Sequence, residues 1–235
     1  MAEATGMKVA VMQPYFFPYL GYFQLIRAVD AFVVFDDVSF IKRGWISRNA
    51  ILGGGVAQRL TLDTSGASQN RLISEVGVGA NRDKLLKTIR QNYARAPQFG
   101  AAYPVIEEAL ALPEDNLTRF LERGLQLVCG YLGLQPRWHR SSGMEKETGL
   151  RGQDKVLALC ETLGASHYIN LPGGQALYDR AEFARRGITL SFIRPRPIAY
   201  RQFGGPFVPN LSIIDVMMFN DREQCANLLQ EYDLA

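Results

Sequence analysis

A strand, a turn, a helix and a second strand at the start of the chain constrain the fold more than any other feature of the sequence. Residues 8–12 (KVAVM) and residues 31–35 (AFVVF) are short apolar runs rich in β-branched side chains, which predicts two buried strands. Two prolines end the first run, and apolar side chains at helical spacing predict a helix over residues 19–29. Because a crossover helix joins parallel strands, we expect an α/β fold with a Rossmann-like parallel sheet.

The alternation of strands and helices returns in the last third of the chain, and the middle is mainly helical. Breaks near Pro97 and Pro113 divide the helical middle, and Asn116 is expected to cap the helix that follows. The other expected elements are a hairpin of residues 45–51 and 59–62 around glycines 53–55, strands over residues 136–139, 166–170 and 188–193, and helices over residues 153–163, 177–186, 212–219 and 222–232. We expect a disordered leader, residues 1–6, and a single α/β domain, residues 7–235, with a helical subdomain at about 81–135.

Composition and missing motifs exclude several classes of protein. The net charge is only +3 and no run of lysines and arginines occurs, although the excess of arginine favours an anionic ligand. Three cysteines without a CxxC partner predict reduced thiols and a cytoplasmic location, and no apolar run is long enough for a membrane span. With His139 and His167 as the only histidines, we expect no metal site, and the GxSxG and GxGxxG motifs are absent. The sequence names no cofactor.

The first candidate site segment, residues 13–23, lies where the first strand gives way to the first helix. Ligands of open parallel sheets bind at the carboxyl ends of strands, where helix N-termini also offer free N–H groups. Gly21 would let a second segment or a ligand approach closely, whereas aromatic residues taken singly are more typical of a core. The side chains expected to bind a substrate here are Gln13, Tyr15, Tyr19 and Tyr22.

The second segment, residues 36–49, begins at the carboxyl end of the second strand and should face the same cleft. Neighbouring side chains of an extended chain point in different directions, so at most one of Asp36 and Asp37 should face the ligand, as a base or as a partner of an amine or ribose. The cations that follow could hold a phosphate or stabilise a developing negative charge, and the alternative is a solvated hairpin with ion pairs. We expect Asp36, Asp37 and Lys42 to be catalytic and Arg43, Trp45, Arg48 and Asn49 to bind substrate.

The third segment follows another expected strand and contains two glycines. A glycine-rich loop at a strand end can wrap a phosphate or a base with backbone groups, although the lysine and hydroxyl of a P-loop are missing here. We expect Asn170, Gly173, Gly174 and Tyr178 to bind substrate, and all three segments to line one cleft.

Six runs of the sequence, in order, carry a resemblance to a known family: QPYFFPYLGYFQLI, FDDVSFIKRGWISRN, LGASHYINLPGGQALYD, FARRGITLSF, AYRQF and LSIIDVMMFN. In these runs the chain resembles the WbqC-like protein family, from residue 7 to about residue 220. By this resemblance the motif positions are Gln13, Tyr19, Gly21, Asp36, Asp37, Lys42, Trp45, Arg48, Asn49, Tyr178, Gln202, Ser212 and Asp215.

The resemblance implies a transferase of bacterial surface-glycan or secondary-metabolite biosynthesis. Such an enzyme would form an amide by moving a glycyl or other acyl group to an amino sugar or a similar amine. The donor stays open between a thioester, an acyl-adenylate and an aminoacyl-tRNA, and so does the oligomeric state. One alternative is an ATP-dependent ligase or nucleotidyltransferase of the Rossmann-like type, although Gln13 and Tyr22 stand where the histidines of an HxGH motif would be. Another is a non-catalytic pathway binding protein.

A tRNA donor would need a surface that follows phosphates, and one predicted helix carries several cations. These residues are Arg82, Lys84, Lys87, Arg90 and Arg95. They do not form a single tight stripe at helical spacing, so a solvated helix face is favoured over a tRNA site.

Overall fold

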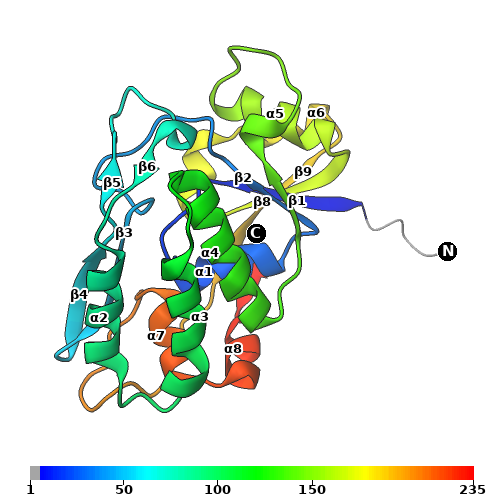
Figure 1. Ribbon diagram of the computed structural model, residues 1–235. Coiled ribbons are helices and arrows are strands. Elements are labelled where there is room, and N and C mark those ends of the chain that lie inside the picture. Colours follow the sequence, from blue (N-terminus) through cyan, green and yellow to red (C-terminus); the bar gives the residue numbers. More distant parts are fainter. Residues whose placement is uncertain (1–5) are drawn as a thin grey trace.

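The computed structural model describes residues 6–235, and a six-stranded sheet forms its centre (Figure 1). The strands are β1 (Met7–Met12), β2 (Ala31–Val34), β7 (Arg137–Arg140), β8 (Ala165–Asn170), β9 (Thr189–Pro195) and β10 (Tyr232–Leu234). Their order across the sheet is β10-β9-β8-β1-β2-β7, and every neighbouring pair is parallel except β10 with β9. The α/β fold class is therefore confirmed, with one antiparallel strand at the edge. Except for Gly6, the expected leader lies outside the described residues.

Helices cover both faces of the sheet (Figure 1). On one face lie α1 (Leu20–Arg27), α4 (Leu117–Leu132), α7 (Ile213–Phe219) and α8 (Arg222–Leu228), and on the other lie α5 (Gly152–Thr162) and α6 (Arg180–Arg185). Successive side chains of a strand point to opposite faces, so Phe32 and Val34 join one hydrophobic core while Ala31 and Val33 join the other. This alternation explains why the strands read as continuous apolar runs.

The long connection between β2 and β7 holds the remaining elements. They are the hairpin of β3 (Arg48–Gly53) and β4 (Val56–Thr61), the short pair β5 (Thr64–Ser65) and β6 (Gly77–Val78), and the helices α2 (Arg82–Tyr93) and α3 (Phe99–Ala111). Gly54 and Gly55 have positive φ angles of 60° and 83°, as the hairpin turn requires. As expected, the Asn116 side chain caps α4 by accepting from the Arg119 amide. Ile89 of α2 and Leu110 of α3 belong to the same core as Phe32 of the sheet.

Two predicted helices near the C-terminus differ from the structure. The helix predicted over residues 222–232 ends at Leu228, and β10 then pairs with the open edge of β9, where its backbone groups find partners. The helix predicted over residues 177–186 starts at Arg180, because the Asp179 side chain accepts from the Ala181 amide and caps it there.

All three cysteines are buried and unpaired, which confirms the expectation of free thiols. Among the described helices, none combines the length and the apolar character that a membrane crossing requires.

Candidate functional site

The order of the strands reverses at β1. From β1 the chain moves outward to β2 and β7 on one side, and then returns to β8 and β9 on the other. A sheet that reverses in this way opens a crevice between the two strands at the reversal, outside their carboxyl ends. Here those strands are β1 and β8, and Gln13 and Asn170 lie at their carboxyl ends. The three predicted segments follow β1, β2 and β8, so they begin at the same edge of the sheet, as expected.

The first two segments are joined by hydrogen bonds to the backbone of residues 16 and 17. The Phe16 amide donates to the Trp45 carbonyl oxygen at 3.2 Å. The Asn49 amide nitrogen donates to the carbonyl oxygens of Phe16 at 3.2 Å and Phe17 at 2.6 Å, while its oxygen accepts from the Ala50 amide. The buried Asn49 side chain is therefore occupied in holding the first segment in place.

Phe17 is the strained point of the first segment. Its φ angle is 40°, in the left-handed region that residues other than glycine rarely adopt. Its carbonyl oxygen accepts from Asn49 and also from the Ser212 hydroxyl at 2.7 Å. Two buried donors thus hold a backbone conformation that the local sequence does not favour. Such strain is found where the surrounding structure fixes a functional loop.

The aromatic residues of the first segment divide between the core and its border. Tyr22 is fully buried, and its hydroxyl donates to the Gln13 carbonyl oxygen at 2.8 Å, so Tyr22 positions the backbone of Gln13. Tyr15 is half-buried and packs its ring against that of Tyr22, with 5.4 Å between the centroids. The half-buried Gln13 side chain makes no hydrogen bond within residues 6–235, so its amide is available to a ligand at this edge of the sheet.

Asp36 and Asp37 both lie within hydrogen-bond distance of the Ser141 hydroxyl but otherwise have different partners. Asp36 is 2% exposed. Its carboxylate accepts from the Ser142 amide at 2.9 Å and from the Ser142 hydroxyl at 2.8 Å, and the Ser141 hydroxyl lies 3.1 Å away. This carboxylate ties the carboxyl end of β2 to the turn that follows β7.

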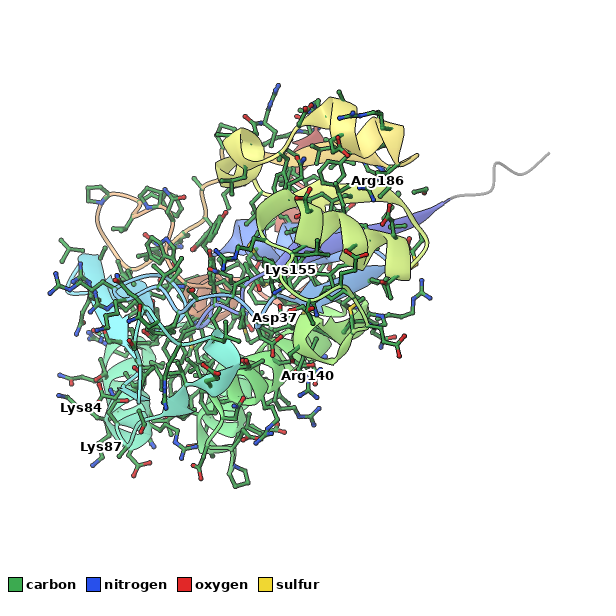
Figure 2. All side chains as sticks on the ribbon, turned by 90° about the horizontal axis from the view of Figure 1, so that it is seen from above. Asp37, Lys84, Lys87, Arg140, Lys155 and Arg186 are labelled. Carbon is green, nitrogen blue, oxygen red and sulfur yellow. The ribbon has the colours of Figure 1, made fainter. Side chains whose placement is uncertain are left out.

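Asp37 lies between two lysines from later parts of the chain. Lys146 and Lys155 each place Nζ 2.9 Å from Asp37 Oδ2, and the Ser141 hydroxyl donates to Oδ1 at 2.5 Å. Figure 2 shows Lys155 beside Asp37 near the middle of the view. The two lysines and the carboxylate, here named the Asp37 cluster, carry a net charge of +1 at the edge of the sheet.

The lysines keep Asp37 ionised. Burial alone would raise the pKa of this carboxyl group, but the hydrogen bonds from Ser141, Lys155 and Lys146 outweigh it and lower the pKa. The Lys155 ammonium also donates to the Asp37 carbonyl oxygen at 2.6 Å and lies 5.6 Å from the centre of the Phe35 ring. The cluster is therefore a preformed group of charges that suits an anion.

The cations of the second segment lie on an exposed turn. Lys42 and Arg43 are exposed, and Arg43 has a positive φ of 61°. Trp45 is 59% exposed, which is unusual for a tryptophan, and Arg48 is half-buried at the start of β3. No ion pair joins these cations to a carboxylate within residues 6–235, so the structure does not bring Lys42 to Asp37.

The third segment forms a short 3-10 turn, Pro172–Leu177, after β8. Asn170 is buried, and its side chain bonds to the Tyr168 hydroxyl and the Leu171 amide. A Cβ at Gly174 would lie 2.8 Å from the Asn170 amide nitrogen, so a side chain there would displace this amide. Gly173 has open space instead, and the half-buried Tyr178 hydroxyl lies 3.2 Å from that of Tyr168.

A second buried carboxylate, Asp215, lies on the same side of the sheet as α1 and binds three side chains. It is 0% exposed and accepts at 2.7 Å from each of Tyr93, Tyr200 and Gln202. Burial raises its pKa, and these hydrogen bonds oppose the rise only in part. Asp215 lies in the first turn of α7, and it anchors the chain that follows β9.

Sequence reasoning missed Ser141, Lys146 and Lys155. The rule that selected Gln13, Asp36 and Asn170, a polar residue at the end of a strand or directly after it, also selects Ser141 after β7. The two lysines have no such local signal, because only the fold brings α5 and its preceding loop over the end of β2. Among residues 6–235, no group of three His, Cys, Asp or Glu side chains is placed to hold a metal ion.

Comparisons with known proteins agree with the motifs. The model of the WbqC-like protein family matches residues 13–227, which include every motif position named above. Uncharacterized protein Rv1507c of Mycobacterium tuberculosis is 28% identical over 218 residues, covering 91% of this chain and 93% of the relative. No solved structure matches the chain. Because the family model spans most of the sequence, the chain belongs to the WbqC-like protein family.

Proposed function

We propose that this protein is a cytoplasmic transferase that forms an amide bond on an amine, such as an amino sugar, by using an activated glycyl or other acyl donor. Family membership supports the proposal. The observation that carries it is the Asp37 cluster, two lysines and a carboxylate preformed at the carboxyl edge of the sheet. We further propose that the sheet is Rossmann-like, with the substrates meeting near its reversal point.

The chemistry needs one proton acceptor and one source of positive charge. The neutral amine nitrogen attacks the acyl carbon, a new C–N bond forms, and the carbonyl oxygen becomes an oxyanion. Lys155, whose ammonium donates only to Asp37 among residues 6–235, stabilises this oxyanion, while Lys146 is occupied by Asp37 and two backbone carbonyl oxygens. The attacking nitrogen becomes acidic once it is bonded to carbon, so even a carboxylate of lowered pKa can accept its proton, and Asp37 takes this role. The leaving group then departs with the electron pair of its bond to carbon.

Lys42 and Arg43 fit a different role in the same reaction. Both are exposed and lie on the turn next to Trp45, away from the ion pairs of the Asp37 cluster. We assign them to an anionic part of the donor or acceptor, such as a phosphate.

The test is product formation by the purified protein. It is incubated with a panel of amino sugar nucleotides and with a glycyl thioester, glycyl-adenylate or glycyl-tRNA, and mass spectrometry measures the gain of one glycyl group. Asp37→Asn and Lys155→Met should each lower the rate by about 100-fold or more, while Lys84→Met on α2 should leave it unchanged. Full activity of both edge variants would overturn the proposed site.

A second candidate is an ATP-dependent ligase or nucleotidyltransferase, favoured by the strand order with its reversal at β1. Release of pyrophosphate from ATP and magnesium in the presence of the amine distinguishes it from direct acyl transfer.

A further inference from the structure

The irregular chain between β9 and α7 borders a cavity of about 640 Å³. Residues 200–207 of this chain line it, together with the turn from α2 to α3 and the last residue of α7. Its volume falls in the range of small-molecule sites. No residue of the Asp37 cluster lines it, and neither the family match nor the proposed transfer reaction assigns a ligand to it.

The charged side chains that line the cavity are all positive within residues 6–235. Arg95 and Arg201 border it, and no aspartate or glutamate of this range does. Neither guanidinium group forms an ion pair within the same range, whereas Arg196, in the same irregular chain, pairs with Glu231 and Asp233. A cavity with two positive charges and no carboxylate at its wall favours an anionic ligand.

The loop that carries Arg201 adds backbone donors. Gly204 and Gly205 line the cavity, and their amides donate to no carbonyl oxygen within residues 6–235. Gly205 has a φ angle of 123°, which side chains rarely allow, so the loop depends on glycine at this position. Free amides of a glycine-containing loop can donate to phosphate oxygens. Together with two arginines, which bind phosphate through paired hydrogen bonds, they favour phosphate as the anion.

Gln202 holds this loop in one shape. Its side chain donates to the Val208 carbonyl oxygen at 3.1 Å and accepts from the Val208 amide at 2.8 Å, which closes the loop of residues 202–208. The same amide nitrogen donates to Asp215 at 2.7 Å. Asp215 is fully buried and does not line the cavity, so it supports the loop from the core side. The cavity is therefore preformed by contacts within the protein.

Aromatic side chains supply the apolar part of the lining. Phe203 lies edge-on to Phe219 with 4.8 Å between ring centroids, and Phe207 lies edge-on to Tyr200 at 5.1 Å. All four of these residues line the cavity. Phe203 and Phe207 are half-buried, so part of each side chain stays accessible to a ligand. Aromatic rings of this kind stack well on the planar base of a nucleotide.

We propose that this cavity binds a nucleoside diphosphate. The diphosphate neutralises Arg95 and Arg201 and accepts from the loop amides, while the base stacks on the phenylalanine rings. An uncharged sugar or an apolar chain would leave both arginines without a counter-charge, and a bare phosphate would leave the rings uncovered. The site stands independently of which reaction the Asp37 cluster performs.

The first experiment compares ligands on the unchanged protein by isothermal titration calorimetry at low salt without magnesium. The probes are UDP, ADP, their nucleosides and inorganic pyrophosphate. UDP or ADP should bind about tenfold more tightly than both its own nucleoside and pyrophosphate, because only the nucleotide uses the arginines and the rings together. If neither nucleotide binds at millimolar concentration, or neither exceeds pyrophosphate, the assignment is overturned.

The second experiment locates the nucleotide in the cavity. Arg95→Ala and Arg201→Ala should each weaken its binding about tenfold, whereas Lys84→Ala, which removes one exposed positive charge from α2, should retain it. Both arginines are exposed, so urea denaturation should show that the variants fold like the unchanged protein. Unchanged binding by either arginine variant would place the nucleotide elsewhere, and the proposal would fail.

A third variant separates this cavity from the Asp37 cluster. Lys155→Met should bind the nucleotide as well as the unchanged protein does, because Lys155 does not line the cavity. A loss of binding in Lys155→Met that the arginine variants do not share would move the nucleotide to the Asp37 cluster and overturn the proposal. Since no acyl transfer is measured, a protein that binds the nucleotide through its arginines but transfers no glycyl group would leave this site standing and the proposed transfer failing.

Discussion

Asp37 and Asp215 are both carboxylates that accept hydrogen bonds from several donors, yet their pKa values shift in opposite directions. Asp37 lies at the edge of the sheet, where two lysines and a serine lower its pKa. Asp215 lies in the core, where two tyrosines and a glutamine donate to it, no cation within residues 6–235 pairs with it, and its pKa is raised.

This difference shows that neutral and charged hydrogen-bond donors have different effects on a carboxylate. Neutral hydroxyl and amide donors fix geometry in the core, since each has a defined direction. Ammonium groups add charge that a substrate can share, because a lysine can turn from its carboxylate to an incoming anion. We therefore interpret Asp215 as the anchor of the chain that follows β9 and Asp37 as part of a functional site.

Removing Asp215 should have the largest effect on stability. Asp215→Ala leaves the buried Tyr93 hydroxyl and the half-buried Tyr200 hydroxyl without their acceptor and removes one of two acceptors of Gln202, so we expect the free energy of unfolding to fall by about 3 kcal/mol. Asp215→Asn keeps one acceptor oxygen and should lose less. Urea denaturation monitored by circular dichroism measures both, and a loss below that of Asp37→Ala would show that Asp215 is not the anchor.

Removing Asp37 should affect activity far more than stability. Lys146 and Lys155 still donate to backbone carbonyl oxygens in Asp37→Ala, so we expect the free energy of unfolding to fall by about 2 kcal/mol, less than in Asp215→Ala. Transfer activity should fall in the same variant. A loss as large as that of Asp215→Ala would mean that the Asp37 cluster holds the fold together.

The two carboxylates should respond to acid with opposite signs. The lowered pKa of Asp37 contributes stability at neutral pH that is lost as the pH falls through its folded value, below about 4. The raised pKa of Asp215 contributes stability that is complete below about pH 4 and is lost as the pH rises through its folded value. The difference in the free energy of unfolding between the unchanged protein and Asp37→Asn should therefore shrink as the pH falls. Compared with Asp215→Asn, the unchanged protein should become more stable as the pH falls. Urea denaturation between neutral and acid pH measures how the free energy of unfolding of each protein changes with pH.

Lys84 and Lys87 should show the smallest effect and provide the baseline for the two edge lysines. Both are exposed on α2, and Figure 2 shows them at the periphery, far from Asp37. Lys84→Ala with Lys87→Ala should change the free energy of unfolding by less than about 0.5 kcal/mol. Binding of bulk tRNA at two salt concentrations tests the remaining alternative. A steep salt dependence that these substitutions remove would make α2 a phosphate-binding face.

The strands of the sheet could be predicted from the sequence because each buried parallel strand is a short apolar run that can be recognised from its own residues. Residues 8–12 and 31–35 show this, and so does the parallel pairing of β1 with β2. β10 was missed because Tyr232, Asp233 and Leu234 have no strand pattern of their own, and their pairing depends on the open edge of β9.

The candidate site was predicted in part for the same reason. Strand ends located Gln13 and Asp37, which are local features. The lysines beside Asp37 are separated from it along the chain, as in the contact of Lys155 across 118 residues, and no periodicity reports such a pairing. The roles of Asn49 and Tyr22 also changed, because only the fold shows that their polar atoms are used by neighbouring carbonyl groups.

The strained backbone at Phe17 has a consequence for synthesis on the ribosome. One of its two donors, Ser212, lies 195 residues further along the chain. While the chain is being made, the first segment is present long before this donor emerges, and contacts of such long separation form late in folding. A nascent chain can therefore build its first strand and helix early, but the loop between them reaches its final shape only when the protein is nearly complete. Truncated products of this chain should accordingly carry an unfinished binding loop, whatever else in them has folded.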